Sequence, residues 1–348
     1  MGILSSIYKT ALSGRRLLYR KGIRKTKKLP AKVISIGNLT LGGTGKTPAV
    51  IAIAQEAKKR GFKPCVLTRG YKGKTKRPCL SSKDKKYFLS TQLAGDEAVL
   101  MAYRLKDIPV VKGQNRFLAG VYAMGELGVD AINMFILDDG FQHWALHRDM
   151  DILLIDASNP FGNEKLFPEG ILREPLHAMK RADIIVITKA DMVNKESIAA
   201  ITQKIKQFNT KTPIYTASHK PKVLLNTSGE TRELEMLSNK KIYAFAGIAN
   251  PSYFKKVLTS KGADIVQFKT YRDHYNYSQK DINKIKKDAG DLEIITTEKD
   301  FVKLSELDMP ENIFALRVDF SIDDTFYNYI FDVLTSDYSD YKGRLHKL

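Results

Sequence analysis

Short apolar runs alternate along the chain with longer segments whose apolar positions recur at helical spacing, such as Pro48–Arg60, Glu97–Leu105 and Ser197–Phe208. This alternation predicts an α/β fold, with a mostly parallel sheet flanked by helices on both faces. The runs with the length of strands are Val33–Ile36, Cys65–Thr68, Asn133–Leu137, Asp151–Ile155, Asp183–Thr188, Lys241–Ala246, Ala263–Phe268, Glu293–Thr297 and Ile313–Arg317.

A polar stretch at Thr216–Lys240 interrupts this alternation and is the best candidate for a domain boundary. We therefore expect a larger domain over residues 29–225 and a smaller C-terminal α/β domain over residues 226–348. A chain of 348 residues is long enough for two domains that each bury a core.

The charge is strongly uneven. The chain has 57 Lys and Arg against 38 Asp and Glu, a formal net charge of +19, and its first acidic residue is Glu56. Such a distribution favours an anionic partner, which could be a nucleic acid, an anionic lipid surface or a phosphorylated substrate. A solvated lysine-rich surface is the simpler alternative. No nucleic-acid-binding module is recognisable, so we expect no nucleic-acid partner.

Two segments carry much of this charge. Met1–Lys28 has nine basic residues and none that is acidic, and Arg69–Lys86 reads as a loop rich in glycine and lysine. In the first, apolar residues at 3, 4, 7, 8, 11, 12, 18 and 19 recur at helical spacing. We expect a basic amphipathic helix that docks on a membrane; a helix packed on the protein's own core is the alternative.

The compartment follows from what the chain contains. It has two cysteines, Cys65 and Cys79, which suits a reducing cytosol better than a disulfide-stapled secreted scaffold. No apolar run approaches the length of a bilayer span, and no signal peptide is visible. We expect a cytosolic, peripheral protein.

The strongest chemical signal is the sequence GGTGKT at residues 42–47, between the first strand and a helix that begins near Pro48. Glycines let backbone N–H groups surround phosphate oxygens, and the helix dipole adds to the attraction. Lys46 would reach the β- and γ-phosphates, and the Thr47 hydroxyl would bind Mg²⁺. The common pattern has Gly where this chain has Thr40. A glycine-rich turn with an incidental lysine is the alternative.

A second signal is the pair Asp138 and Asp139, which ends an apolar strand and precedes Gly140. In phosphate-loop folds, an acid at this place holds or orients magnesium. A simple turn after a strand would need the same residues. His143 and His147 have the spacing of zinc ligands on one helix face, but no third ligand lies nearby in the sequence.

The residues alone do not decide between a functional and a structural role for four smaller features. Asp96 and Glu97 open a helix, where they could act chemically or simply cap it. Arg173 and Glu174 could contact phosphates and metal or form an exposed ion pair. The segment Thr188–Asp191 resembles the guanine-reading element of GTPases, and Asp273-His274 could be structural or catalytic.

The combination resembles the tetraacyldisaccharide 4′-kinase family, the lipid A 4′-kinases. The phosphate loop with Thr at position 40 is similar to that of the family. The other matching segments are Thr68–Tyr71, Gly95–Glu97, Leu137–His143, Leu172–Pro175, Phe245–Pro251, Asp273-His274 and Thr297–Asp300, in the family's order.

This resemblance implies transfer of the γ-phosphate of ATP to the 4′-hydroxyl of a tetraacyldisaccharide 1-phosphate, giving lipid IVA. It implies ATP and Mg²⁺ as cofactors, a place at the cytoplasmic face of the inner membrane of a Gram-negative bacterium, and a C-terminal domain that closes over the active site. No obligate protein partner is implied. The alternatives are a nucleotide-switch ATPase or GTPase and a nucleic-acid-binding protein.

The resemblance also assigns residues. Asp96 matches the proposed base, working with His274, and Lys46 is the third catalytic residue. The nucleotide would be bound by Thr40, Leu41, Gly42, Gly43, Thr44, Gly45, Lys46 and Thr47. Magnesium would be bound by Thr47, Asp138, Asp139 and Glu174. The acceptor would be contacted by Arg69, Tyr71, Gln142, His143 and Arg173.

Overall fold

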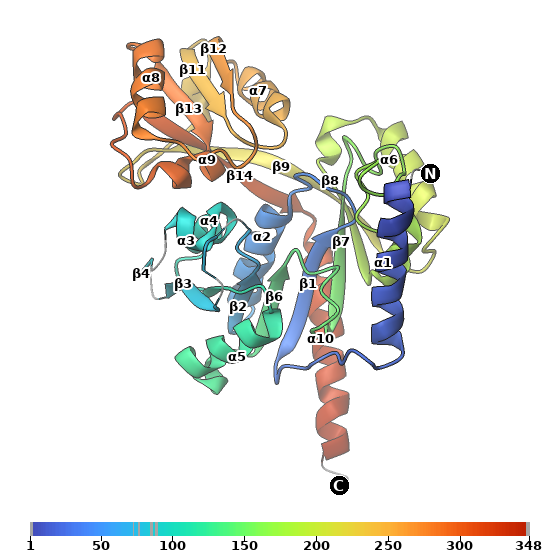
Figure 1. The fold of residues 1–348 in the computed structure, drawn as a ribbon. Coiled ribbons are helices and arrows are strands. Elements are labelled where there is room, and N and C mark those ends of the chain that lie inside the picture. Colours follow the sequence, from blue (N-terminus) through green and yellow to red (C-terminus); the bar gives the residue numbers. More distant parts are fainter. Residues whose placement is uncertain (1–2, 72, 76, 84–85, 88–89, 346–348) are drawn as a thin grey trace.

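The computed structural model describes residues 3–345 apart from 72, 76, 84–85 and 88–89 (Figure 1). Small parts of the two basic segments therefore lie outside the described residues. Every strand expected above is present, with ends that move by a few residues. The expectation of an α/β fold with a mostly parallel sheet is confirmed.

The larger layer is a sheet in which parallel strands follow the order β5-β2-β6-β1-β7-β8-β9, with β3 and β4 antiparallel at the β5 edge. Every residue of β2, β6, β7 and β8 is buried, as expected for parallel strands covered on both faces. The strands are β1 (Lys32–Asn38), β2 (Pro64–Thr68), β3 (Cys79–Lys83), β4 (Lys86–Tyr87), β5 (Val110–Lys112), β6 (Met134–Asp138), β7 (Met150–Asp156), β8 (Ile184–Thr188) and β9 (Ile214–Leu225).

The segment Arg69–Lys86 is not a loop throughout, because β3 forms in its second half and β4 begins at Lys86. Leu80 pairs with Val111 of β5. The isolated sequence gave no hint of this pairing, since the strand is short and its partner lies about thirty residues away.

Helices cover both faces of the larger layer (Figure 1). One face packs against α2 (Lys46–Lys59), α4 (Asp96–Arg104) and α10 (Asp324–Leu345). The other packs against α5 (Arg116–Leu127) at β1, β2 and β6, and against α6 (Lys195–Lys206) at β7 and β8. The short α3 (Thr91–Ala94) directly precedes α4.

Two long strands, β9 and β14 (Ile313–Ile322), connect the larger layer to a smaller one. The start of β9 pairs with β8, and the rest pairs antiparallel with β14. We expected a polar boundary segment at Thr216–Lys240, and its first ten residues are instead strand. As far as Val223, more exposed and less exposed residues alternate, which suits a ribbon that is covered on one side.

The smaller layer contains the parallel strands β12 (Asp264–Thr270), β11 (Lys241–Ala246), β13 (Glu293–Thr297) and β14, in that order. One face packs on α7 (Pro251–Ser260) and the other on α8 (Gln279–Ala289). Between β13 and β14 lies the short α9 (Glu298–Phe301), and β10 (Thr231–Arg232) pairs with the end of β9.

The C-terminal helix α10 returns to the larger layer. Its buried residues Phe326, Ile330, Phe331 and Leu334 join the core beneath α2, and the Phe331 ring lies 5.3 Å from that of Phe62. This departs from the expectation that residues 226–348 form one C-terminal unit. The apolar side of α10 packs on the larger sheet, whose strands come much earlier in the sequence.

Candidate active site

The phosphate-loop segment follows β1 and leads into α2. Gly42 and Gly45 have φ angles of 116° and 83°, a conformation that glycine adopts without strain. Gly45 is the N-cap of α2, and Lys46 is its first residue. The first turn of α2 lines a central cavity, so its free N–H groups and the helix dipole favour an anion there.

Side chains from β9 and from the end of β8 support the backbone of this loop. Thr188 donates a hydrogen bond to the carbonyl of Thr44 at 2.9 Å, and Lys189 donates to that of Gly43 at 2.9 Å. The His219 ring lies so close to Gly45 that an added Cβ would come within 2.4 Å of it. In this chain the Thr188–Asp191 segment therefore helps to set the loop's conformation.

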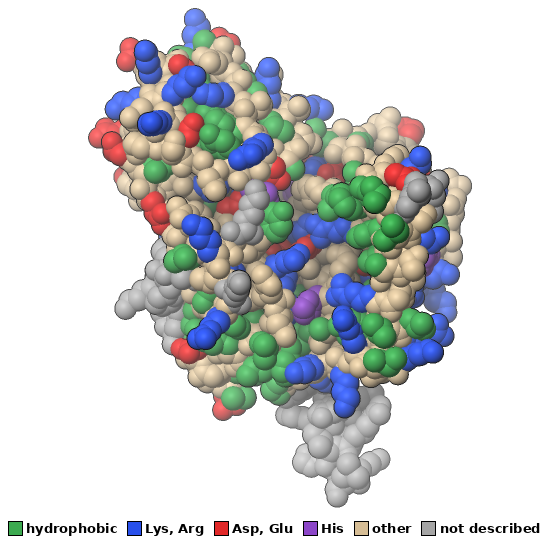
Figure 2. Space-filling model, viewed as in Figure 1, with side chains coloured by type: hydrophobic (Ala, Val, Ile, Leu, Met, Phe, Trp, Pro, Cys, Tyr) green, Lys and Arg blue, Asp and Glu red, His purple; other side chains and the backbone are tan. Residues whose placement is uncertain are grey.

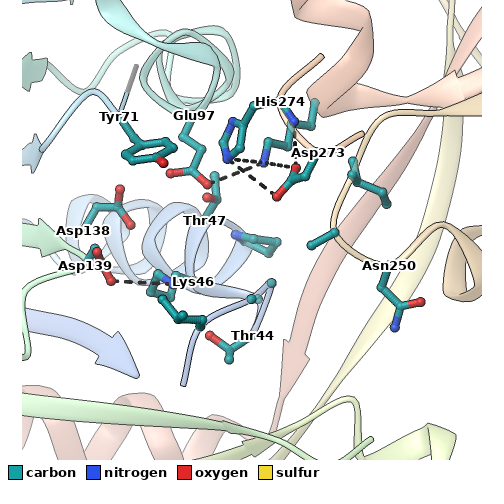
Figure 3. Close-up of a pocket in the computed structure, with 18 of the residues that line it drawn as sticks. Thr44, Lys46, Thr47, Tyr71, Glu97, Asp138, Asp139, Asn250, Asp273 and His274 are labelled. Carbon is teal, nitrogen blue, oxygen red and sulfur yellow. Dashed lines mark hydrogen bonds and ion pairs between the residues drawn. The ribbon is translucent and has the colours of Figure 1, made fainter. Parts of the chain in front are cut away.

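The cavity has a volume of about 1000 Å³ and is lined by residues of both layers. Every residue from 41 to 48 lines it, as do residues 248–250 and 297–299 of the smaller layer. Figure 3 shows Lys46 and Thr47 at the start of α2, with Asp138 and Asp139 on one side and Asp273 and His274 on the other. The loop and the smaller layer therefore face each other across one site.

Asp138 ends β6 with its side chain buried. One carboxylate oxygen accepts a hydrogen bond from the Thr68 hydroxyl at 2.8 Å, and the other has no hydrogen-bond partner in the part of the chain that the structure describes. Burial, together with the charges of Glu97 and Asp139, raises the pKa of Asp138 to about 7. Among the described residues, no Lys or Arg forms an ion pair with Asp138, so this buried carboxylate is suited to receive a metal cation.

Asp139 has the opposite electrostatic environment. It accepts two hydrogen bonds from Arg173, at 2.7 and 2.9 Å, and its carboxylate lies 3.6 Å from the Lys46 ammonium. Burial acts to raise the pKa of Asp139, but Lys46 and Arg173 outweigh burial and lower it to about 2. Asp139 is therefore ionised and holds both cations in place.

Three residues predicted for the site, Thr40, Asp96 and Glu174, do not line the cavity. Glu174 accepts hydrogen bonds from Arg181 at 2.8 and 2.9 Å and does not line the cavity. Thr40 is buried, and its backbone forms an isolated β-bridge to Leu172. Glu174 is drawn away because Arg181, seven residues further on, satisfies its carboxylate.

Asp96 and His274 meet across the two layers. Asp96 is the first residue of α4, and its carboxylate lies 2.8 Å from Nδ1 of His274. The Lys299 ammonium lies 3.9 Å from the same carboxylate oxygen and 3.2 Å from Asp273. Burial acts to raise the pKa of Asp96, but the His274 hydrogen bond and Lys299 lower it overall.

The residues predicted to contact the acceptor surround this pair and the loop. The Tyr71 ring is half exposed and lies 5.2 Å from the His274 ring. Arg69, Gln142 and His143 also line the cavity. Gln142 uses its amide to donate a hydrogen bond to the carbonyl of Asn38 at 2.8 Å.

The donors at this site suit magnesium. Asp138, with an unpartnered oxygen, and the Thr47 hydroxyl are hard oxygen donors, which Mg²⁺ prefers. Among the described residues, no group of three or more His, Cys, Asp or Glu could hold a metal. Mg²⁺ needs no such group, because it keeps waters and takes phosphate oxygens. His147, the second histidine considered for zinc, lies beside Asp149 and does not line the cavity.

Sequence reasoning gave no role to several residues of the site. Lys299 belongs to the matched segment Thr297–Asp300, and Lys189 to the segment compared with GTPases. The sequence therefore pointed to both segments, although not to these side chains. Nothing in the sequence pointed to His219 or Arg15, because their positions in the cavity wall depend on how β9 and α1 (Ile3–Arg20) pack.

Comparison with known proteins gives a consistent result. A family model described as tetraacyldisaccharide-1-P 4′-kinase matches residues 1–335. The tetraacyldisaccharide 4′-kinase of Syntrophus aciditrophicus is 40% identical over 318 residues, covering 88% of this chain and 84% of that protein. That of Halothermothrix orenii is 35% identical over 347 residues, covering 93% and 89%.

The structure is also similar to a solved one, LpxK from Aquifex aeolicus in complex with ATP. The two share 34% sequence identity and a TM-score of 0.78, over 95% of this chain and 97% of the other. The family model covers nearly the whole chain, and the relatives match over most of their length. The chain belongs to the tetraacyldisaccharide 4′-kinase family.

Proposed function

We propose that this protein transfers the γ-phosphate of ATP to the 4′-hydroxyl of a tetraacyldisaccharide 1-phosphate, giving lipid IVA. The observation that carries the proposal is that a phosphate-binding loop lines the same cavity as His274, whose Nδ1 lies 2.8 Å from the carboxylate of Asp96. The names of the relatives and the ATP complex of the similar structure support the choice of acceptor and nucleotide.

The loop and α2 would bind the nucleotide's phosphates. Lys46 stabilises charge on the transferring group, and Asp139 fixes the position of Lys46 and Arg173. Thr47 and Asp138 would hold Mg²⁺, which when bound neutralises charge on the phosphates. Asp138 has to be ionised for this role, and a nearby cation lowers its pKa.

Asp96 would accept the proton of the acceptor hydroxyl. Its lowered pKa keeps it ionised at neutral pH, and its oxygen lies 2.8 Å from Nδ1 of His274. His274 would orient the Asp96 carboxylate. The Lys299 ammonium lies 3.4 Å from Nε2 of His274 and would balance the charge of the surrounding acids. A positioned base typically contributes about 10²- to 10⁴-fold to such a transfer.

The expected membrane contact rests on α1, and hydrophobic and basic side chains lie side by side where α1 crosses the face shown in Figure 2. Within the described residues, no helix could cross a membrane. The α1 helix is attached to the larger layer by Ser5 and Tyr8, which donate hydrogen bonds to the carbonyls of Leu166 and Arg173. Its residues Leu4 and Ile7 are 66% and 60% exposed. The predicted apolar stripe is thus divided between the protein and the solvent.

We infer that the exposed side of α1, with its basic residues, docks on the anionic cytoplasmic face of the inner membrane. Apolar side chains enter the headgroup region, and each Lys or Arg near anionic lipid adds about 1 kcal/mol. The acceptor is itself a lipid, so an enzyme held at the membrane surface would find it by diffusion in two dimensions.

The activity is tested by thin-layer chromatography of labelled phosphate transfer. With [γ-³²P]ATP and Mg²⁺, the protein should label the tetraacyldisaccharide 1-phosphate, and Lys46→Ala should not. ATP hydrolysis without any labelled lipid would refute the proposal and favour the nucleotide-switch alternative.

The membrane contact is tested by vesicle sedimentation. The double variant Leu4→Gln/Ile7→Gln should bind phosphatidylglycerol vesicles less than the native protein, and salt should weaken native binding. Val266 of β12 is 56% exposed, so Val266→Gln is the matched control. Deleting residues 1–24 is a poorer test, because Tyr8, Leu12 and Arg15 line the cavity. Equal binding by both variants would place the contact elsewhere.

A further inference from the structure

One buried charge of the larger layer has no part in the chemistry described above. Lys112, the last residue of β5, is only 1% exposed and does not line the central cavity. Its ammonium donates hydrogen bonds to the carbonyl of Thr75 at 2.7 Å, to the Thr75 hydroxyl at 2.5 Å and to the carbonyl of Leu93 at 2.9 Å. An ammonium has three donors, so all of them are used.

The ammonium is buried without a counter-charge. In the described part of the chain, no carboxylate forms an ion pair with Lys112, and burial lowers its pKa. A methionine would fill similar space without taking a charge out of water. What the ammonium adds is a set of hydrogen bonds that joins two segments, the loop after β2 through Thr75 and the turn before α4 through Leu93.

The two segments are packed backbone against backbone. An added Cβ at Gly73 would come within 2.6 Å of the carbonyl oxygen of Leu93, and one at Gly95 within 2.5 Å of that of Tyr71. Gly95 has a φ angle of 91°, which glycine adopts without strain. Neither segment can shift by much unless the other one moves with it.

Each segment carries a residue that contacts His274. Gly95 is the N-cap of α4 and directly precedes Asp96, whose carboxylate lies 2.8 Å from Nδ1 of His274. The Tyr71 ring, on the other segment, lies 5.2 Å from the His274 ring (Figure 3). The hydrogen bonds of Lys112 therefore hold together two groups of the larger layer that meet the smaller layer at the site.

We propose that Lys112 is a positioning residue for phosphate transfer, because its ammonium fixes the start of α4, and with it Asp96, against the loop that carries Tyr71. This inference rests on the function proposed above. Lys112 contacts neither ATP nor the acceptor. It acts on kcat rather than on nucleotide binding, since the phosphate loop is supported separately by Thr188, Lys189 and His219.

The test is steady-state kinetics on Lys112→Met and Thr75→Val. Lys112→Met should lower kcat about 10- to 100-fold, the range for a lost hydrogen bond to a charged group, with an unchanged KM for ATP. Thr75→Val removes one acceptor of the three and should lower kcat about two- to tenfold. In the Asp96→Ala background, Lys112→Met should lower kcat less than about threefold, because it acts through Asp96. A merely structural role would give a full further loss there.

The control for stability is Leu334→Ala, in the core beneath α2 and away from the cavity. It should lower the melting temperature but keep native kcat below that temperature. Native kcat in Lys112→Met, a raised KM for ATP, or additive losses with Asp96→Ala would overturn the inference. If Lys112→Met did not fold, Thr75→Val would decide by the same comparisons.

A second measurement does not depend on activity. In native-state hydrogen exchange, Lys112→Met or Thr75→Val should speed exchange at the amides of Lys74 and Thr75, which donate to the carbonyls of Gln92 and Leu93, but not in α2. Unchanged exchange at these amides would refute the anchoring role whatever the activity. A native protein that phosphorylates no lipid would instead refute the proposed function.

Discussion

Replacing Arg104 by Gln tests whether contact between the two layers controls catalysis. Arg104 is the last residue of α4, the helix that begins at Asp96. It donates to Glu298 of the smaller layer at 2.8 Å and also pairs with Asp319 of β14. Glu298 directly precedes Lys299, which contacts the opposite end of α4. Both ends of one helix are therefore tied to the smaller layer.

The magnitude follows from burial. The side chains of Arg104 and Glu298 are only 6% and 10% exposed, and burial raises the pKa of Glu298 despite Arg104. Removing one partner of a buried pair costs about 3–5 kcal/mol, and we take the lower end because Asp319 is partly solvated. About 3 kcal/mol corresponds to a change of roughly 100-fold in an equilibrium. We expect kcat to fall about 10- to 100-fold. The exact factor depends on how strongly the native protein favours the state in which the two layers are in contact.

The assay is steady-state kinetics on Arg104→Gln, Glu298→Gln and the double variant. The KM for ATP should change little, because the phosphate loop belongs to the larger layer. The double variant should be more active than Arg104→Gln alone, because it no longer buries an unpaired carboxylate. Lowering the pH should also restore some activity to Arg104→Gln, since protonation removes the charge of a Glu298 whose pKa is raised.

The matched control is Arg60→Gln, which loses an ion pair with Glu56 inside the larger layer. If Arg104→Gln lost no more activity than this control, the contact would be structural only. Additive losses in the double variant would likewise contradict the coupling between Arg104 and Glu298.

Three further predictions concern the chemistry. Lys46→Ala should lower kcat at least about 100-fold with a nearly native melting temperature, since it removes charge stabilisation from the transferring group. Asp96→Ala and His274→Ala should each lower kcat about 10²- to 10⁴-fold, with the double variant little worse, because the two act as a unit. Burial and two neighbouring carboxylates raise the pKa of Asp138 to about 7, so calorimetric Mg²⁺ affinity should fall about tenfold per pH unit below 7.

Each of these three predictions would be contradicted by a different result. Near-native turnover by Lys46→Ala would contradict the phosphate-loop assignment. Additive losses in Asp96→Ala/His274→Ala would indicate two independent roles, and a pure loss of ATP affinity in Asp96→Ala would make it a nucleotide ligand. Mg²⁺ binding that is independent of pH from 5 to 8 would exclude Asp138 as a ligand.

The parts of the site that were predictable are those fixed by local sequence. The loop at residues 42–47 lies between a strand and a helix because glycines and a helix start can be read from adjacent residues. The carboxylates of Asp138 and Asp139 were predictable for the same reason, since they directly end an apolar strand. Their different environments were not, because Arg173 and Thr68 come from distant segments.

What was missed depends on contacts between distant residues. In β9, polar residues and Pro221 mask a strand whose partner, β14, lies about a hundred residues further along. Glu174 pairs with Arg181 and does not line the cavity, which its place in a matched segment could not reveal. The helix α1 was predictable from its periodicity, but which of its residues would be covered was not.

The residues of the site come from both layers, and this affects when phosphate transfer can occur. The phosphate loop, Asp138 and Asp139 all belong to the larger layer, so nucleotide and metal could be bound by that layer alone. Asp96 also belongs to it, but His274 and Lys299, which lower the pKa of Asp96, come from the smaller layer. Separating the layers would leave a carboxylate without the groups that orient it. A base that is completed only by contact between the layers would limit transfer to the closed site, where bulk water is excluded.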